Sequence, residues 1–280
     1  MSQAPRRRQL ARTVILDRAL ESLPLFRLSD SGEEVAISYT ADGGGRWRVL
    51  PAPGERLPGT FDQDVYVELL RRYHEADAPA DGGLTFTLHA FLRTMGRRVD
   101  GRTYEQLRSA LNRLQRTSLE STNAWFDASA GALWTGQFPV LAAVSIDRRR
   151  QTDRDQLALF HSLTNNEPGD AHVTLAPQLR SNIEAGFTIA LVAARYQQLS
   201  SPVARRLYRV LQVARTEVGR SWQVPLERLA EQLPLSQRYP SHLQRVLQPA
   251  HEMLLAAGVL RSAAITQDGK IWLVNYQLAE

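Results

Sequence analysis

The chain carries one structural pattern twice, and this repetition limits the possible folds more than any other feature. Residues 84–133 and 222–274 each predict a strand, a short helix, a turn, a longer helix and a two-stranded ribbon. This is the layout of a winged helix-turn-helix, in which the second helix can lie in the major groove of DNA. The sequence therefore predicts an α+β protein with two tandem winged helix-turn-helix domains.

In both copies, residue chemistry separates the short helix from the long one. Gly96 breaks the first short helix, and Pro234 stops the second. The long helices have apolar stripes at helical spacing over 104–114 and 243–254. A stripe on one face leaves a polar face opposite it, which is the arrangement that a DNA-reading helix requires.

The composition is that of a soluble globular protein. The 280 residues are 43% hydrophobic and 22% charged, enough for two domains that each bury a core. The longest apolar runs, 138–146 and 187–194, are shorter than the roughly 20 residues that span a bilayer. Arginines 6–8 are not followed by the apolar segment of a secretory signal. We expect a cytoplasmic protein associated with nucleoid or plasmid DNA.

The charge of the chain is compatible with a nucleic-acid partner. Its net charge is +5, and its isoelectric point is near 9.9. Lys270 is the only lysine among 34 basic residues, so the other 33 are arginine. Arginine has a planar fork that suits phosphates and guanine edges, but a GC-rich genome explains the same excess.

The sequence predicts an arm followed by two domains. Residues 1–18 form a basic arm, residues 19–150 an N-terminal winged-helix domain with extra strands, and residues 151–280 a C-terminal winged-helix domain. The boundary falls somewhere between 147 and 187. The extra strands form a hairpin around the glycine-rich turn 42–45.

The ribbon of the first domain is expected within 119–146, with its turn at 127–131. That turn is acidic, although a wing that touches DNA is usually basic. The arginine cluster 148–150 follows the ribbon and could contact phosphate, link the domains or form a solvated turn. Further along, 157–163 is strand-like, and 189–199 is compatible with either strand or helix.

No pattern of catalytic residues stands out. The glycine-lysine pair at 269–270 follows no phosphate loop, and the six histidines have no paired metal-binding spacing. The acidic pairs 62/64 and 153/155 are typical of helix caps and solvated loops, and no nucleophile elbow is present. Zero cysteines exclude disulfides, thiolate zinc sites and cysteine nucleophiles. We expect a binding protein with no enzymatic activity, no cofactor and no metal.

Motifs in both halves connect the chain to a known family. They are, in the second half, YQQLSSP at 196–202, RRLY at 205–208 and WQVPL at 222–226, and in the first half TFDQDV at 60–65, YEQL at 104–107 and ALNRL at 110–114. In this order and spacing, over roughly residues 35–262, the chain resembles the plasmid replication initiator A family.

The resemblance implies a sequence-specific double-stranded DNA-binding initiator. Such a protein binds repeated sites at a plasmid or secondary-chromosome origin, opens adjacent DNA and recruits host replication proteins. Members of related groups also repress their own promoters, often as homodimers. Two alternatives stay open: a winged-helix transcriptional regulator without a replication role, and a scaffold that binds DNA without site preference. Repeated footprints, a single palindromic operator and no footprint would distinguish the three.

The polar faces of the two long helices supply the candidate DNA contacts. Asn suits adenine and Arg suits guanine, whereas phosphate contacts position the protein without reading sequence. Tyr208 and Trp222 are expected in the core. In the first domain the candidates are Arg102, Thr103, Gln106, Ser109, Asn112, Arg113, Arg116, Arg148 and Arg149. In the second they are Ser241, His242, Gln244, Arg245 and Gln248, with Arg205, Arg206, Arg209 and Lys270 for phosphate.

Overall fold

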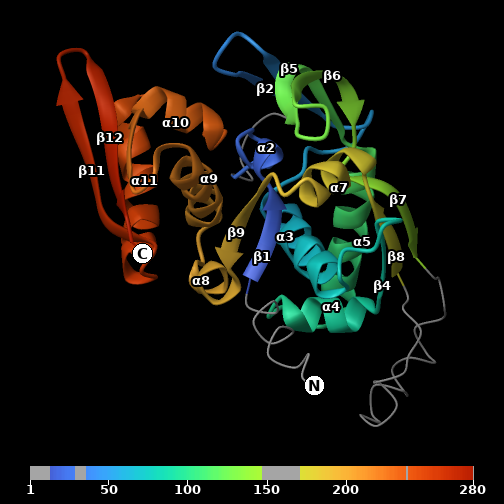
Figure 1. Cartoon of the computed structure of the whole chain (residues 1–280). Coiled ribbons are helices and arrows are strands. Elements are labelled where there is room, and N and C mark those ends of the chain that lie inside the picture. Colours follow the sequence, from blue (N-terminus) through green and yellow to red (C-terminus); the bar gives the residue numbers. More distant parts are fainter. Residues whose placement is uncertain (1–12, 29–35, 147–170, 238, 280) are drawn as a thin grey trace, which may run out of the picture.

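The computed structural model describes residues 13–28, 36–146, 171–237 and 239–279 (Figure 1). Two winged units stand side by side, the first built around α3, α4 and α5 and the second around α9, α10 and α11. Their buried apolar residues form one continuous core. The expectation of two tandem winged helix-turn-helix units is confirmed.

The first unit contains three helices and a three-stranded sheet. Its helices are α3 (Thr60–Glu75), α4 (Leu88–Thr94) and α5 (Gly101–Arg116). Its sheet is antiparallel in the order β4-β8-β7, with β4 at Gly83–Phe86, β7 at Leu141–Ile146 and β8 at Ala171–Leu175. The buried side of α5 packs on α3 and on β7.

The predicted wing of the first unit is wrong. Strands β5 (Ser118–Asp127) and β6 (Ala132–Phe138) do form the expected hairpin, but it joins β2 (Ile37–Thr40) and β3 (Arg46–Leu50) in a sheet of order β2-β3-β5-β6. The sheet buries Trp47 of β3 and Trp125 of β5, and both rings lie against Phe138 of β6. The acidic turn 127–131 therefore belongs to this added sheet and not to a wing.

The wing position is taken by β7 and β8. These two strands pair with each other, and β8 also pairs with β4. The chain that connects them, 147–170, lies outside the described residues, as do the arginine cluster and the predicted strand 157–163. Because β8 follows the expected boundary at residue 150 and still belongs to this sheet, the division between the units stays a proposal.

A two-stranded sheet joins a strand near the N-terminus to the segment that connects the two units. β1 (Thr13–Asp17) pairs with β9 (Thr188–Val192), so the expected arm 1–18 ends in a strand. Helices α2 (Arg18–Glu21) and α7 (Pro177–Glu184) pack against this sheet. β9 leads directly into α8 (Ala193–Gln198), so residues 189–199 contain both a strand and a helix.

The second unit follows the predicted pattern. α9 (Pro202–Val218) begins at the N-cap Ser201, and α10 (Leu226–Gln232) and α11 (Pro240–Ala256) form the helix pair. The sheet has the order β10-β12-β11, with β10 at Ser221–Pro225, β11 at Leu260–Asp268 and β12 at Ile271–Leu278. Tyr208 is buried as expected, and Trp222 stacks on Tyr276 at 5.7 Å.

Two absences can be stated for the described part of the chain. None of its helices combines the length and the apolar character needed to cross a bilayer. Within the same residues, no group of three or more His, Cys, Asp or Glu side chains could hold a metal ion.

Candidate nucleic-acid interface

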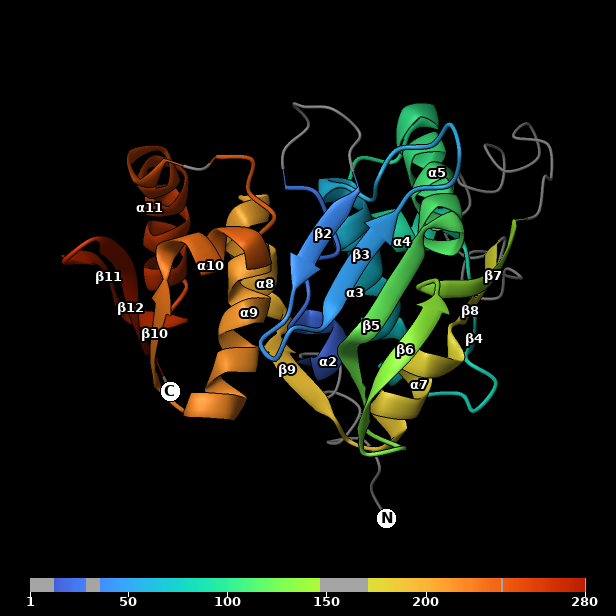
Figure 2. The same ribbon diagram turned by 90° about the horizontal axis from the view of Figure 1, so that it is seen from above.

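The two long helices of the helix-turn-helix units lie along the same side of the molecule. Figure 2 shows α11 at the upper left and α5 at the upper right of the view, with the sheet β2-β3-β5-β6 lower in the picture. Both helices turn an apolar face inward, so each leaves its polar face exposed.

The N-terminus of α5 is closed by a capping box. The Asp100 carboxylate accepts a hydrogen bond from the Thr103 amide at 2.9 Å, and the Thr103 hydroxyl accepts one from the Asp100 amide at 3.0 Å. The Thr103 hydroxyl also lies 2.7 Å from the Arg98 carbonyl, to which it donates. The Thr103 hydroxyl, a predicted DNA contact, is therefore used in capping the helix. The Asp100 carboxylate lies at the helix N-terminus, where a DNA phosphate would approach.

Two arginines of α5 are held by carboxylates of the first unit. Arg113 lies 2.9 Å from the Asp62 carboxylate on α3, which is almost fully buried. Burial raises the pKa of Asp62, and the nearby Arg113 charge opposes that rise. Arg116 forms an ion pair with Glu55 but keeps a 56% exposed side chain. The position of Arg113 does not fit the predicted base contact.

The rest of the predicted α5 set lies on the exposed face. These residues are Arg102, Gln106, Ser109 and Asn112. They follow one another at helical spacing and include the amide and guanidinium groups that pair with adenine and guanine. The structure brings these four together as predicted.

The N-terminus of α11 has a different chemistry. Its N-cap residue, Tyr239, provides no side-chain hydrogen bond, and Pro240 occupies the first helical position. Ser241, His242 and Arg245 are exposed on the first turns. The sequence of α11 has no acidic residue before Glu252. This end of the helix can therefore face an anion without a carboxylate beside it.

Gln244 is partly exposed in this face of α11, and Gln248 is exposed one turn further along. The Gln248 amide donates to Glu252 at 2.9 Å. Pro249 lies inside the helix and has no amide hydrogen for the Arg245 carbonyl one turn earlier. The polar face of α11 thus runs from Ser241 to Gln248, as predicted from its spacing.

Tyr239 is a candidate contact that the sequence analysis missed. Its side chain is 71% exposed, more than any other large hydrophobic residue in the described ranges. Its ring meets the His242 ring edge to face, with 5.8 Å between the ring centres. The helix pattern gave no signal for Tyr239 because it precedes the first helical residue, although an aromatic residue just before a recognition helix could have been noted.

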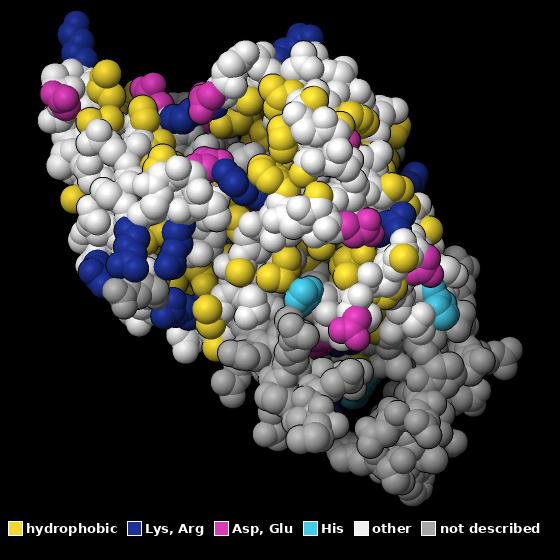
Figure 3. All heavy atoms as spheres, viewed as in Figure 1, with side chains coloured by type: hydrophobic (Ala, Val, Ile, Leu, Met, Phe, Trp, Pro, Cys, Tyr) yellow, Lys and Arg dark blue, Asp and Glu magenta, His cyan; other side chains and the backbone are white. Residues whose placement is uncertain are grey.

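The wing of the second unit carries the predicted basic residue. Lys270 is exposed in the turn between β11 and β12, beside Gly269, whose φ of +58° closes the hairpin. In Figure 3, which shows the face seen in Figure 1, Lys and Arg side chains gather over the second unit, whereas acidic and basic side chains alternate over the first. This face therefore gives the second unit the more positive surface.

Three predicted phosphate contacts lie inside the protein. Arg206 and Arg209 are 2% and 1% exposed and both bind the Glu21 carboxylate, so a phosphate cannot reach them in this structure. Arg205 is mostly buried and pairs with Asp64 on α3. These three predictions are corrected: the arginines hold the two units together. Arg148 and Arg149 lie outside the described residues.

Two buried titratable groups distinguish the cores of the units. In the first, Asp17 accepts hydrogen bonds from Asn182, Trp125 and the Ala19 amide, and burial raises its pKa to about 7. In the second, His251 lies 2.8 Å from the Tyr276 hydroxyl, and burial lowers its pKa to about 4. Both residues face the interior, away from the polar faces of α5 and α11.

The fold and the two recognition-type helices define a tandem winged-helix protein. A crystal structure of domains 2 and 3 of RctB matches with a TM-score of 0.57 at 10% identity, covering 90% of this chain and 94% of that chain. A second RctB domain 2–3 structure matches with a TM-score of 0.51 at 9% identity, covering 94% and 97%. No curated protein sequence matches the chain.

The family is shown by a match to replication initiator protein A over residues 16–253. The chain belongs to this family and is a replication initiator. The resemblance inferred from the sequence motifs is confirmed. The family is one of initiators and not of known enzymes.

Proposed function

We propose that the chain binds specific double-stranded DNA sites at the origin of its replicon by placing α5 and α11 in successive segments of the major groove. The position of both helices along one side of the molecule carries this proposal (Figure 2). Helix-turn-helix proteins read two segments when their recognition helices face the same side of a duplex. Membership of an initiator family supports the origin as the location of the sites.

The second unit makes the stronger contact in this proposal. The open N-terminus of α11, the exposed Arg245 and the Lys270 wing offer positive charge without a neighbouring buried acid. In α5, by contrast, Asp100 adds a negative charge at the N-terminus, and Asp62 and Glu55 bind two arginines. We therefore assign most of the affinity to α11 and its wing.

The proposed roles divide into base reading and backbone contact. Arg245 and Gln248 read base edges from α11, and the Tyr239 ring contacts the edge of the groove beside them. Lys270 binds a phosphate and fixes the position of the wing. The base-reading residues proposed for the first unit are Arg102, Gln106, Ser109 and Asn112.

The wider initiator role follows from the family. We propose that the sites are repeated at the origin of a plasmid or secondary chromosome, and that the bound protein recruits host replication proteins in the cytoplasm. Self-association as a homodimer and repression of its own promoter belong to the same proposal. Family membership supports this role.

Footprinting on the DNA that flanks the gene tests the proposal. We expect repeated protected segments with a regular spacing, and affinity that falls steeply with salt because arginine and lysine displace counterions. A single palindromic footprint would instead indicate a regulator. Binding without any preferred site would contradict the proposed sequence-specific function.

Arg245→Ala tests the proposed readout by α11. Losing a bidentate contact to guanine should weaken specific binding by about 1–3 kcal/mol and relax the preference at one base position. Arg46→Ala is the matched control, because Arg46 is an exposed arginine on strand β3, away from α11. Equal losses for the two variants would remove Arg245 from the interface.

A further inference from the structure

Helix α9 runs between the two winged units and carries two arginines that face the interior. Arg206 and Arg209 are among the largest fully buried side chains of the described residues. They follow one another at a spacing of three, which places them on one face of the helix. That face meets α2 of the first unit, with which α9 is in contact.

Arg206 joins the ends of two helices that belong to different units. Its guanidinium donates to the Glu21 carbonyl at the end of α2, to the Leu23 carbonyl just beyond it, and to the Gln232 carbonyl at the end of α10. The distances are 3.0, 2.7 and 3.3 Å. A cation is favoured at such carbonyl ends because helix dipoles are negative there. A single side chain of α9 thus connects the end of α2 in the first unit with the end of α10.

Arg209 extends the connection to α3. It binds both oxygens of Glu21, at 3.0 and 3.1 Å, and donates to the Gln63 side chain on α3 at 2.6 Å. Glu21 is therefore shared by two arginines in the interior, each with directional hydrogen bonds. A buried network of this kind favours one relative arrangement of α2, α3 and α9, because a shift would leave buried charges unpaired.

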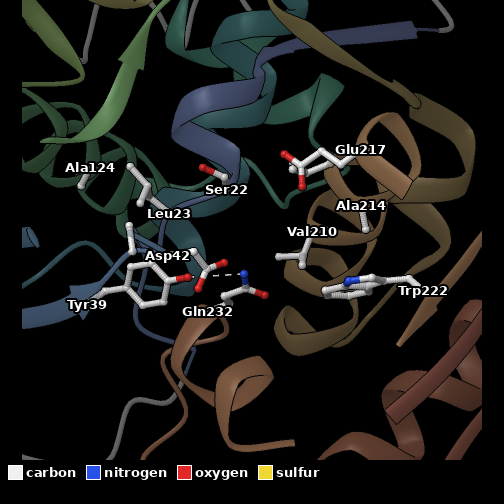
Figure 4. Close-up of a pocket in the computed structure, with 12 residues that line it drawn as sticks. Ser22, Leu23, Tyr39, Asp42, Ala124, Val210, Ala214, Glu217, Trp222 and Gln232 are labelled. Atoms are coloured by element: carbon white, nitrogen blue, oxygen red, sulfur yellow. Dashed lines mark hydrogen bonds between the residues drawn. The ribbon is translucent and has the colours of Figure 1, made fainter. Parts of the chain in front are cut away.

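A second contact holds α10 from its outer side. Arg228 of α10 donates to the Thr40 carbonyl at 2.7 Å and to the Asp42 carboxylate at 2.9 Å, and it stacks over the Tyr39 ring at 4.2 Å. Figure 4 shows Tyr39 and Asp42 of the first unit beside Gln232 of α10, whose side-chain amide donates to the Tyr39 hydroxyl at 3.4 Å; all three line a pocket of about 190 Å³. The β2–β3 hairpin and α2 therefore hold α10 from two sides.

The position of α10 determines that of α11. The two helices pack against each other, and their connection is fixed by the buried Leu233 and Leu235 and by a hydrogen bond from the Leu235 amide to the Ala230 carbonyl. On the other side, α3 packs on α5 and binds it through the ion pair between Asp62 and Arg113. An unbroken series of contacts thus leads from one recognition helix to the other.

We propose that Arg206 positions the two recognition helices relative to each other, so that the protein measures the spacing between two segments of its DNA site. Arg206 touches no DNA in this scheme and is a positioning residue. The measurement of DNA spacing rests on the proposed function. The fixed distance between α5 and α11, which we call the geometric part, is a property of the free protein.

The distance between the helices tests the geometric part without DNA. The chain has no cysteine, so Ser109→Cys and Gln248→Cys place one spin label on α5 and one on α11. We expect a single narrow distance distribution in the otherwise unchanged protein and a broadened or shifted one after Arg206→Met. Arg71→Met is the matched control, because Arg71 pairs with acids of its own helix α3 and joins no second unit. An unchanged distribution for Arg206→Met would overturn the proposal.

DNA spacing tests the functional part. On the footprinted site, inserting 5 base pairs between the two protected segments rotates them by about half a helical turn. We expect this insertion to weaken binding of the natural protein at least about tenfold and that of Arg206→Met less than about threefold, with binding to a single segment unchanged. Equal discrimination by both proteins would overturn the role of Arg206. If the natural protein shows no preferred site, the proposed function fails while the distance measurement still decides the geometric part.

Arg228→Ala keeps the test decisive if Arg206→Met does not fold. It removes the outer contact of α10 from a partly exposed position, and we expect an intermediate broadening and a smaller loss of spacing discrimination. No broadening in Arg228→Ala, together with an unfolded Arg206→Met, would mean that the buried arginine serves stability alone and would overturn the proposal.

Discussion

Helices α5 and α11 occupy equivalent places in the two winged units, yet their polar groups are used differently. In α5, Asp100 caps the N-terminus, and Asp62 and Glu55 bind Arg113 and Arg116. In α11, the N-cap residue Tyr239 makes no side-chain hydrogen bond, and the face up to Gln248 has no acid. The polar groups of α5 thus bind residues of its own unit, whereas those of α11 face outward.

Because of this difference, the number of arginines on a helix overstates the charge that the helix can offer to DNA. The α5 sequence has more arginine than the α11 sequence, but part of that charge is neutralised inside the first unit. An arginine that pairs with a buried acid must leave that acid unpaired before it can bind a base. We therefore expect α5 to orient the protein and α11 to supply most of the binding.

The largest expected contrast is in the response of the two cores to pH. The pKa of Asp17 is raised to about 7, so its stabilising contribution is complete below pH 3.8 and is lost as pH rises through 7. The pKa of His251 is lowered to about 4, so its contribution is complete above pH 6.5 and is lost as pH falls through 4. At about 1.4 kcal/mol per pKa unit, the effect is worth about 4 kcal/mol for Asp17 and about 3 kcal/mol for His251.

Urea titrations between pH 4 and pH 7 check this contrast. Relative to the natural protein, His251→Gln should gain stability as the pH falls, and Asp17→Asn should gain stability as the pH rises. Only the slopes are compared, because either substitution also changes hydrogen bonds. Parallel curves for the natural protein and either variant would contradict the assignment for that residue.

The next effect concerns the arginine of α5 that was expected to read a base. Arg113→Met removes the cation beside the buried Asp62 and should lower the free energy of unfolding by about 2 kcal/mol. Arg245→Met, on the outward face of α11, should change it by less than about 0.5 kcal/mol. Chemical denaturation of both variants measures the difference. A stable Arg113→Met protein with relaxed base preference would reverse our comparison of the two helices.

A smaller effect is expected at the capped end of α5. Asp100→Asn keeps an oxygen that can accept the capping hydrogen bond but removes the negative charge that faces the groove. DNA affinity should rise about threefold at low salt, and the gain should vanish at high salt because the charge is screened. Asp77→Asn, an exposed acid after α3, is the control. Unchanged affinity at low salt would place the N-terminus of α5 away from the DNA backbone.

The smallest effect is expected at the wing of the second unit. Lys270→Ala should reduce the slope of log affinity against log salt by about 1, without altering the preferred sequence. Gln267→Ala, an exposed neutral residue of the same ribbon, should leave the slope unchanged. Binding titrations at several salt concentrations measure both. Equal slopes for Lys270→Ala and the natural protein would show that this wing makes no phosphate contact.

The second unit could be predicted closely because the two strands of its ribbon, β11 and β12, are neighbours in the sequence. Strands β11 and β12 are joined by the tight turn at Gly269, and β10 lies directly before the helix pair. Periodicity and turn residues therefore contained the necessary information. The polar face of α11 followed from the same spacing.

The first unit could not be predicted in the same way, because β4 pairs with a strand far along the chain. Gly83 is opposite Thr174, whereas the hairpin β5–β6 follows α5 directly and has the alternation expected of a wing. Alternation shows that a segment is a strand but not which strand is its partner. Pairing between distant strands depends on tertiary packing, which a single sequence does not show.

The prediction of phosphate contacts at Arg206 and Arg209 was wrong for a different reason. Arg206 and Arg209 were grouped with phosphate contacts by residue type, although Val210 and Val213 lie on the same face of α9. At helical spacing, a charged residue aligned with an apolar stripe faces the interior. The signal was present, but the partner Glu21 could not be identified without the fold.

The pairing of β1 with β9 also sets an order of events during synthesis. Thr13 is opposite Val192, so the buried side chains of β1, Val14 and Leu16, have no partner strand until residues beyond Val192 have left the ribosome. Closing so long a loop is slow, because the loss of chain entropy precedes the gain from contacts. Strand β1 thus gains its partner only late in synthesis, and we expect the first unit to finish folding only as the second begins.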